Sequence, residues 1–369
     1  MGKWEMVRLG DVCTLKSGTS LSNEILSNKG EIPYVKVGDM NLQQNASYIN
    51  MSSNYVARQD IEKQIFPVGT VIFPKRGGAI GTNKKRLTSR EICADLNIMG
   101  IIPSEKLLSS YLYSFFQTID LASLQNGSSV PQINNGDIFP IEIPLPPLAI
   151  QQKIADILDR ANILIEKRKT QIEKLDLLVK SQFVEMFGDP VTNPMGWEVA
   201  KWDEVFNTTT GKLDSNAMIE NGEYPFFTCA KEVFSIDNYA FDCEALLLAG
   251  NNAAGIYDVK HYAGKFNAYQ RTYVITLKNN SFSYYPFKLM LEHKLEQMRD
   301  LSKGTNTKYL TMGILNEFVF IVPPLALQIQ FAAFVEQVET QKTQFKKSLA
   351  LLELNYKSLM QKCFSGKLF

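Results

Sequence analysis

The sequence is poor in the residues that build metal and redox sites. Only two histidines occur in 369 residues, His261 and His293, which excludes a centre held by several histidines. The five cysteines form no C-x-x-C pair and are an odd number, which argues against a disulfide framework and a thiolate metal site. We therefore expect reduced thiols and no cofactor bound by this chain; the cysteines are Cys13, Cys93, Cys229, Cys243 and Cys363.

Long hydrophobic runs and a strong charge imbalance are also missing. No stretch approaches the roughly 20 apolar residues of a membrane span. The opening residues, MGKWEMVRLGD, carry charges where a signal peptide has an apolar core. Both features predict a cytoplasmic protein without a membrane partner. The net charge of +1 gives no global basic signature for nucleic acid, and 45% hydrophobic with 21% charged residues is typical of folded domains.

Known catalytic motifs are absent as well. No G-x-x-x-x-G-K-[ST] phosphate loop occurs, and GGAIGTNKK (77–85) leads into a basic, polar stretch instead of the apolar helix that a dinucleotide-binding fold requires. The adenine-methyltransferase signature N/D-P-P-Y/F does not occur either. We therefore expect a chain without catalytic residues.

What the sequence does contain is an internal repeat. NGSSVPQINNGDIFPIEIPLPPLAIQ from Asn126 aligns without a gap with KGTNTKYLTMGILNEFVFIVPPLALQ from Lys303, and WEMVRLGDV from Trp4 aligns with WEVAKWDEV from Trp197. The chain is thus a tandem duplication of a globular head followed by a helix. This predicts a head over 1–143, a helix over 144–187, a linking loop and second head over 188–320, and a second helix over 321–369.

Each predicted helix carries a narrow apolar stripe. Steps of four and three residues place apolar side chains on one line, the spacing of a coiled coil, and only Lys342 interrupts the second stripe. The alternative is an amphipathic helix that lies on its own head, but two copies favour mutual burial. The stripes comprise Ile154, Leu158, Ile165, Ile172, Leu175 and Val179 in the first helix, and Phe331, Val335, Phe345, Leu349, Leu352 and Tyr356 in the second.

Both heads contain a run of basic residues without acids, and such runs suit phosphate contacts. Strand-like segments punctuated by glycine and asparagine predict a mixed α+β head around them. A run of this kind in a single head is more often an ordinary solvated surface, but its presence in both copies favours DNA. The first set is Lys75, Arg76, Lys84, Lys85, Arg86 and Arg90; the second is Lys260, Lys265 and Arg271 with the neighbouring Tyr269 and Gln270.

The passages IPLPPLAIQQKIADILDRANILIEKRKTQIEKLDLLVKSQFVEMFGDP and WEMVRLGDVCTLKSG resemble the specificity subunits of Type I restriction-modification systems. The resemblance implies an α+β fold in which two target-recognition domains, each reading half of a bipartite site in double-stranded DNA, are separated by two antiparallel coiled-coil helices with pseudo-two-fold symmetry. It places two further loops on DNA, with Asn126, Ser128, Ser129 and Gln132 in one and Lys303, Thr305, Asn306 and Lys308 in the other.

The resemblance also implies partners. Two modification subunits would carry S-adenosylmethionine and methylate adenine, and restriction subunits would use ATP and Mg²⁺, so this chain would itself be a non-catalytic specificity subunit. One alternative is a related system whose partner fuses methyltransferase and nuclease in one chain. The other is a two-headed adaptor that binds proteins and no DNA.

Overall fold

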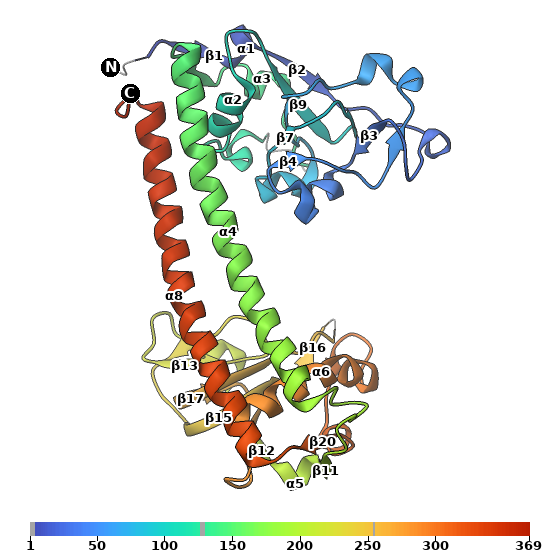
Figure 1. Ribbon diagram of the computed structural model, residues 1–369, viewed down its shortest axis with the longest axis vertical. Helices are drawn as coiled ribbons and strands as arrows, with labels where there is room; N and C mark the ends of the chain where they lie inside the picture. Colours follow the sequence, from blue (N-terminus) through green and yellow to red (C-terminus); the bar gives the residue numbers. More distant parts are fainter. Residues whose placement is uncertain (1–3, 126–129, 254) are drawn as a thin grey trace. The chain divides into compact units, whose positions relative to one another are not determined.

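Two units divide the chain, and each of the two long helices contributes to both (Figure 1). The computed structural model describes residues 4–125, 130–253 and 255–369. Unit 1 consists of residues 1–168 and 348–369, and unit 2 consists of residues 169–347. Each unit therefore combines one head with one segment from each long helix.

The head of unit 1 is built on two small sheets and one strand pair. The strand pair joins β1 to β10, the larger sheet has the order β2-β9-β6-β7-β4, and the smaller has the order β5-β3-β8. The strands are β1 (Met6–Arg8), β2 (Cys13–Ser17), β3 (Ile32–Val35), β4 (Tyr48–Ile49), β5 (Tyr55–Val56), β6 (Val71–Pro74), β7 (Arg86–Thr88), β8 (Cys93–Ala94), β9 (Ile98–Pro103) and β10 (Glu142–Pro144).

Short helices connect these strands. The α-helices of this head are α1 (Leu9–Val12), α2 (Ser109–Phe116) and α3 (Asn135–Ile138), and the 3₁₀ turns are η1 (Asn23–Ile25), η2 (Val37–Asn41), η3 (Gln43–Asn45), η4 (Arg58–Asp60), η5 (Glu62–Gln64), η6 (Gly77–Thr82) and η7 (Leu121–Leu124). Helix α2 packs on β6 and β9 with its apolar face, where Phe116 meets Phe73 at 5.2 Å between ring centroids. The Tyr111 hydroxyl donates to the Pro144 carbonyl at 2.7 Å, so α2 is also fixed to β10.

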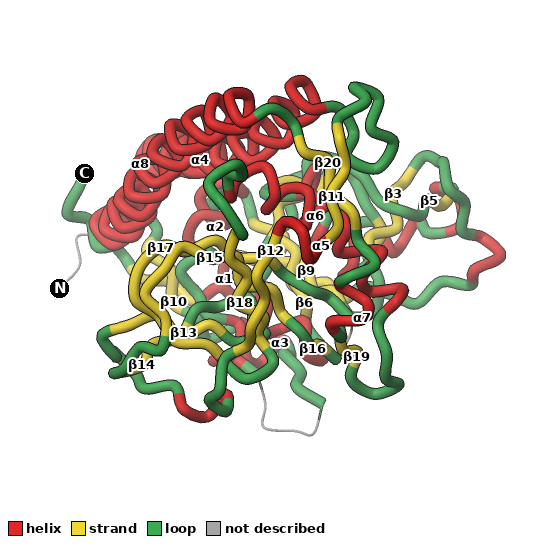
Figure 2. The backbone as a smooth tube through the Cα atoms, turned by 90° about the horizontal axis from the view of Figure 1, so that it is seen from below, coloured by secondary structure: helices red, strands yellow, loops and turns green. Residues whose placement is uncertain are grey.

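Unit 2 repeats this plan with a larger sheet. The strand pair is β11 with β20, and the main sheet has the order β12-β18-β15-β17-β13-β14. Figure 2 shows these strands in yellow. The strands are β11 (Glu198–Lys201), β12 (Phe206–Thr210), β13 (Tyr224–Phe227), β14 (Phe234–Ile236), β15 (Phe241–Ala249), β16 (Asn251–Asn252), β17 (Val259–Ala268), β18 (Thr272–Leu277), β19 (Lys308–Tyr309) and β20 (Val319–Val322).

The α-helices of this head follow its strands in the same order along the chain as the α-helices of the first head. They are α5 (Trp202–Val205), α6 (Tyr284–Leu301) and α7 (Met312–Leu315), and the 3₁₀ turn is η8 (Ser215–Ala217). Helix α6 packs on β15 and β17, as α2 packs on its own sheet. Trp202 of α5 is fully buried, and its Nε1 donates to Thr208 Oγ1 at 2.8 Å. The duplication seen in the sequence is therefore a duplication of topology.

The long helices are α4 (Leu148–Phe187) and α8 (Leu325–Phe364), each of 40 residues. In unit 1 the beginning of α4 packs near the end of α8, because Ile154 and Leu158 share a cluster with Cys363. In unit 2 the order is reversed, and Phe183 near the end of α4 meets Phe331 near the beginning of α8 at 5.8 Å between ring centroids. The helices are therefore antiparallel in both units, as the resemblance implied.

The apolar stripe on each helix is buried or partly buried along its length. Ile154, Leu158, Ile165, Leu175, Val179, Phe331 and Val335 are buried, while Ile172, Phe345, Leu349, Leu352 and Tyr356 are partly buried. The stripe covers its own head as well as the other helix, since Ile154 and Leu158 also pack in the cluster of β6 and α2. The two interpretations of the stripe therefore both hold. Lys342, which interrupts it, pairs across the helices with Asp176 and along its own helix with Glu339.

Phe183 tests the helix contact of unit 2. Its ring is fully buried against Phe187, Phe331 and His293. We expect Phe183→Ala to lower the free energy of unfolding by about 3–5 kcal/mol, because it removes a large buried ring and leaves a cavity. The neighbouring Val184 is 47% exposed, so Val184→Ala should change stability by less than about 0.5 kcal/mol. Urea unfolding of both variants measures this, and equal losses would contradict a buried seam.

Candidate nucleic-acid interface

In the first head, two segments far apart in the sequence meet beyond the end of β6. The backbone N–H of Ile133 donates to the Lys75 carbonyl at 2.9 Å, and that of Gly77 donates to the Pro131 carbonyl at 2.8 Å. Between these bonds, Arg76 and Gln132 form an antiparallel bridge. We call residues 75–82 with 130–133 loop pair 1. Two separate sequence signals, a basic run and a family loop, thus converge on one surface.

The second head has an equivalent surface beyond the end of β15. The Leu310 N–H donates to the Gly250 carbonyl at 2.8 Å, and β16 pairs with β19, which sets Asn252 opposite Lys308. The Gly250 N–H donates to the Arg271 carbonyl at 2.8 Å, so the turn before β18 joins the same surface. We call residues 250–253 with 303–309 loop pair 2. It occupies the position of loop pair 1 in the repeat.

A tight turn shapes one side of loop pair 2. Lys303 and Tyr309 bridge each other, and the chain between them reverses at Gly304, whose φ of +98° is unfavourable for other residues. A Cβ at this position would lie 2.1 Å from the Thr307 carbonyl oxygen, so the turn requires glycine. Thr305 and Asn306 are exposed at its tip, where their polar side chains are accessible to a partner.

Several of the predicted contact residues are accessible on these two surfaces. Arg76 is exposed in loop pair 1, and Lys303, Gln270 and Arg271 are exposed at loop pair 2. Gln270 is held by its backbone, whose N–H donates to the Leu213 carbonyl at 2.9 Å. Tyr269 beside it donates its own N–H to the Phe227 carbonyl and is partly buried. Arginine and glutamine side chains on a fixed backbone are suited to phosphates and base edges.

Lys85 is not available for the phosphate contact that we predicted. Its side chain is 1% exposed, and its Nζ donates to Asn83 Oδ1 at 2.7 Å and to the Ile119 carbonyl at 2.5 Å. Asn83 has a left-handed backbone, with φ of +54°, and its Oδ1 also accepts the Leu121 N–H at 2.9 Å. Lys85 therefore connects the end of η6 with η7. Burial lowers the pKa of this lysine to about 8, with the carboxylate of Asp120 opposing the shift.

The rest of the first basic run is dispersed. The guanidinium of Arg86 donates to the carbonyls of Lys85 and Met40 at 2.7 and 2.9 Å, and burial lowers its pKa. Arg90 donates to the Glu31 carbonyl at 2.9 Å, and Lys84 bonds Asn41 Oδ1. Lys75 donates to Ser17 Oγ at 2.8 Å, and burial, with Arg76 nearby, lowers its pKa. Of the six basic residues, only Lys75 and Arg76 belong to loop pair 1.

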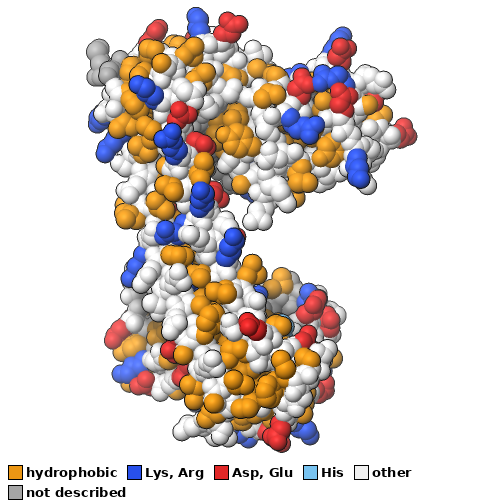
Figure 3. All heavy atoms as spheres, in the orientation of Figure 1, with side chains coloured by type: hydrophobic (Ala, Val, Ile, Leu, Met, Phe, Trp, Pro, Cys, Tyr) orange, Lys and Arg blue, Asp and Glu red, His pale blue; other side chains and the backbone are white. Residues whose placement is uncertain are grey.

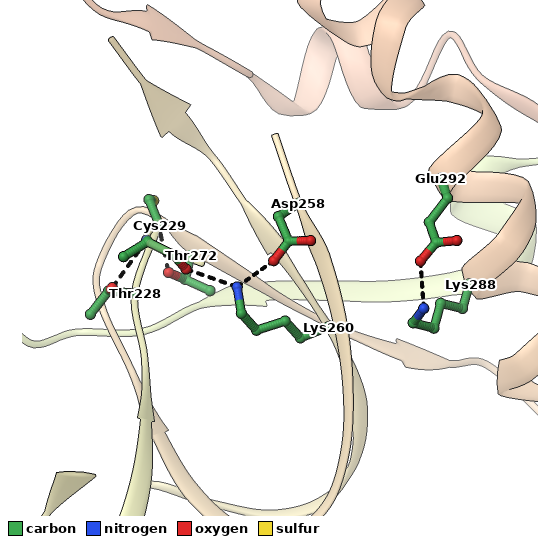
Figure 4. Close-up of polar contacts among 8 residues, drawn as sticks. Thr228, Cys229, Asp258, Lys260, Thr272, Lys288 and Glu292 are labelled. Carbon is green, nitrogen blue, oxygen red and sulfur yellow. Dashed lines mark hydrogen bonds and ion pairs between the residues drawn. The ribbon is translucent and has the colours of Figure 1, made fainter. Parts of the chain in front are cut away.

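Two lysines of the second head have partners that are not residues of loop pair 2. Figure 4 shows Lys260 between Asp258 and a backbone carbonyl; its Nζ lies 2.5 Å from Asp258 Oδ2 and 2.8 Å from the Ala230 oxygen. This charge is therefore balanced within the protein. Lys265 is exposed and lies over the ring of Tyr239, with its Nζ 4.6 Å from the ring centroid. The space-filling view likewise shows charges of both signs interspersed, without a large basic patch on this face (Figure 3).

Sequence reasoning missed Asn251 and Asn252, which form β16 at the centre of loop pair 2. The signal was present in the segment AGNNAAG (249–255), which occupies in the repeat the place of PKRGGA (74–79). Because asparagine carries no charge, a search for basic runs passes over it. The predicted residues Asn126, Ser128 and Ser129 lie outside the described part of the chain.

The described residues contain neither a group of three or more His, Cys, Asp and Glu side chains that could hold a metal ion nor a helix that could cross a membrane. What the described fold presents instead is a duplicated two-headed frame, in which each head carries one exposed loop pair and continues into a long helix. This arrangement defines a class of proteins with two related binding surfaces.

The chain belongs to the family of Type I restriction modification DNA specificity domains, whose model matches residues 1–175 and 194–354. The Type I restriction enzyme EcoDI specificity subunit of Escherichia coli is 34% identical over 181 residues, which are 47% of this chain and 39% of that protein. The MjaIX specificity subunit of Methanocaldococcus jannaschii is 24% identical over 409 residues, with 99% of this chain and 93% of that protein covered.

A solved structure shares the fold over nearly the whole chain. The S subunit of a Type I restriction-modification system from M. genitalium matches with a TM-score of 0.63 at 18% identity, covering 98% of this chain and 96% of that one. The predicted architecture is thereby confirmed: mixed α and β heads, a duplication, and two long helices that pack together.

Lys85 gives a test that depends on pH. Below pH 8 the folded lysine must be charged in its buried position, so the cost of burial is constant. Above pH 8 the folded lysine loses its proton while the unfolded lysine, with a pKa near 10.4, keeps it, so stability rises with pH by up to about 1.4 kcal/mol per unit. Between pH 8 and 10 we therefore expect the free energy of unfolding of the wild type to rise relative to that of Lys85→Met. Urea unfolding at several pH values measures the difference. Parallel pH profiles would contradict a buried ammonium group.

Proposed function

We propose that this chain is the DNA sequence-specificity subunit of a Type I restriction-modification complex in the cytoplasm. Each head would read one half of a bipartite site in double-stranded DNA, and the helix pair would set the distance between the halves. The observation that supports this most is the equivalence of loop pairs 1 and 2. Two equivalent surfaces with different residues, Arg76 and Gln132 against Lys308 and Arg271, suit two half-sites of different sequence.

The chemistry would belong to partner subunits. Two modification subunits, one for each copy of the repeat, would carry S-adenosylmethionine, and restriction subunits would use ATP and Mg²⁺. This chain would bind DNA without catalysing a reaction. The test is to express this chain in a host together with its modification subunit. Sequencing that detects methylated bases then maps the methylated adenines in the host DNA. Methylation within a bipartite sequence motif supports the proposal. If the complex neither methylates nor binds DNA, the alternative of a two-headed adaptor that binds proteins is favoured instead.

Salt dependence tests which residues contact phosphate. Arg76 lies in loop pair 1, whereas Arg90 is fixed to the Glu31 carbonyl on another part of the head. For the assembled complex, Arg76→Ala should reduce the slope of log K against log salt by up to about 0.9, because one phosphate contact is lost. Arg90→Ala should leave the slope unchanged. Binding titrations at four salt concentrations measure this, and the opposite ranking would contradict the assignment of loop pair 1.

The length of the helix pair tests the proposed spacer. One heptad inserted after Arg168 and another after Lys347, the points where the units divide, keeps the apolar stripe in phase. The insertion adds about 10 Å, or roughly three base pairs, between the half-sites. We expect the preferred spacer to lengthen while the half-site bases stay the same. Methylation of a library with varied spacers measures this; an unchanged spacer in a folded complex would mean that the helices do not set it.

A further inference from the structure

A fully buried glutamine lies in the first turn of each long helix. Gln151 in α4 and Gln328 in α8 are both 0% exposed, and the repeat places them at equivalent positions. Burying a side-chain amide in a protein core is unfavourable unless its donors and acceptor find partners. The bonds of these two side chains therefore show what each residue is built to hold.

The Gln151 amide binds three backbone groups of its own unit. Its Oε1 accepts the N–H of Leu108, the N-cap residue of α2, at 2.9 Å. Its Nε2 donates to the Lys106 carbonyl at 3.0 Å and to the Pro146 carbonyl at 2.9 Å. One side chain thus connects the loop that leads into α2 with the proline segment that leads into α4.

Gln328 repeats the arrangement in unit 2. Its Oε1 accepts the N–H of Ser283, the N-cap residue of α6, at 2.9 Å. Its Nε2 donates to the Ser281 carbonyl at 3.4 Å and to the Pro323 carbonyl at 2.8 Å. The bonded residues are again the N-cap, the residue two positions before it, and the proline five positions before the glutamine. The heads differ in sequence at these loops, yet the bonding pattern is the same.

The chemistry of the site requires glutamine. One acceptor and two donors must converge from a single side chain, and only the amides of Gln and Asn supply both. Asparagine is shorter by one methylene group and would not span the same distance, whereas glutamate would set a carboxylate against two carbonyl oxygens. The same residue in both copies therefore reflects a geometric requirement of the helix start.

These bonds connect each loop pair to its long helix through rigid elements. Helix α2 packs on β6, which ends at loop pair 1, and α6 packs on β15, which ends at loop pair 2. Each glutamine fixes the N-terminus of that helix to the start of α4 or α8. A change at the glutamine would therefore tilt the loop pair on its long helix without altering a residue of the loop pair.

We propose that Gln151 and Gln328 are positioning residues that fix each head on its long helix and thereby restrict the spacer lengths that the protein accepts between half-sites. This inference rests on the proposed function. The proposal separates two properties. The loop pairs determine which bases are read, and the two glutamines determine how strictly the spacer length between the half-sites is limited. A role in stability alone would lower the melting temperature and leave spacer discrimination unchanged.

The test compares Gln151→Met with Gln152→Met in the complex with the modification subunit. Gln152 is the next residue of the same helix turn, but it is exposed and its side chain bonds Asp156, so it receives the same chemical change without the buried contacts. In unit 2 the pair is Gln328→Met and the exposed Gln330→Met. Methylation rates are measured on a library in which both half-sites are fixed and the spacer varies by one and two base pairs, at a temperature where all variants are folded.

We expect Gln151→Met and Gln328→Met to reduce the preference for the native spacer over its neighbours by roughly fivefold or more, because the unpaired buried groups no longer fix the head. The half-site bases should stay the same, and the two exposed controls should match wild type. Equal discrimination in Gln151→Met and Gln152→Met, or altered half-site bases, would overturn the inference.

If Gln151→Met does not assemble, Gln151→Asn takes its place, since it keeps a polar amide but is too short by one methylene group to reach the same three backbone partners. Weaker spacer discrimination than in Gln152→Met then supports the inference, and equal discrimination or altered half-site bases overturns it. Failure of the proposed function would be distinguishable, because wild type itself would then methylate no bipartite site.

Discussion

The structure depends on the antiparallel contact between one segment of α4 and one segment of α8 within each unit. In unit 1 Ile154 and Leu158 meet the end of α8, and in unit 2 Phe183 and Phe187 meet its beginning. The same stripe closes the core of the head from which it emerges. Burial of one apolar line thus serves the head and the helix pair together, and the charged faces of both helices remain in water.

The spacing of apolar residues predicted the two long helices, because a helical stripe depends only on the positions of these residues along the chain. The stripe of α4 and the two helices could be read from the order of apolar residues, the duplication from the alignment of repeated segments, and the structure contains all three. Burial of charge could not be predicted in the same way. Lys85 is covered by Phe116 and Ile119, which fold back onto it from more than 30 residues away, so its neighbours in the sequence gave no indication that it is buried.

The candidate interface shows a similar division. The sequence identified Arg76 and Gln132 from unrelated signals, but their proximity arises from backbone pairing between residues 75–77 and 131–133. The asparagines of β16 were missed since their function would come from position and not from charge. The two copies share this backbone pairing but differ in their loop residues, so the side chains on each surface can vary without changing how the loop is held.

The division of the chain into units has a consequence for the order of folding during synthesis. Unit 2 is one continuous segment, residues 169–347, whereas unit 1 is completed only by residues 348–369. While the ribosome is still making α8, the core of the first head lacks Cys363 and Phe364, and the apolar stripe of early α4 packs on its own head without the end of α8. Unit 2 can thus be completed before unit 1, whose core gains Cys363 and Phe364 only when residues 348–369 have been made.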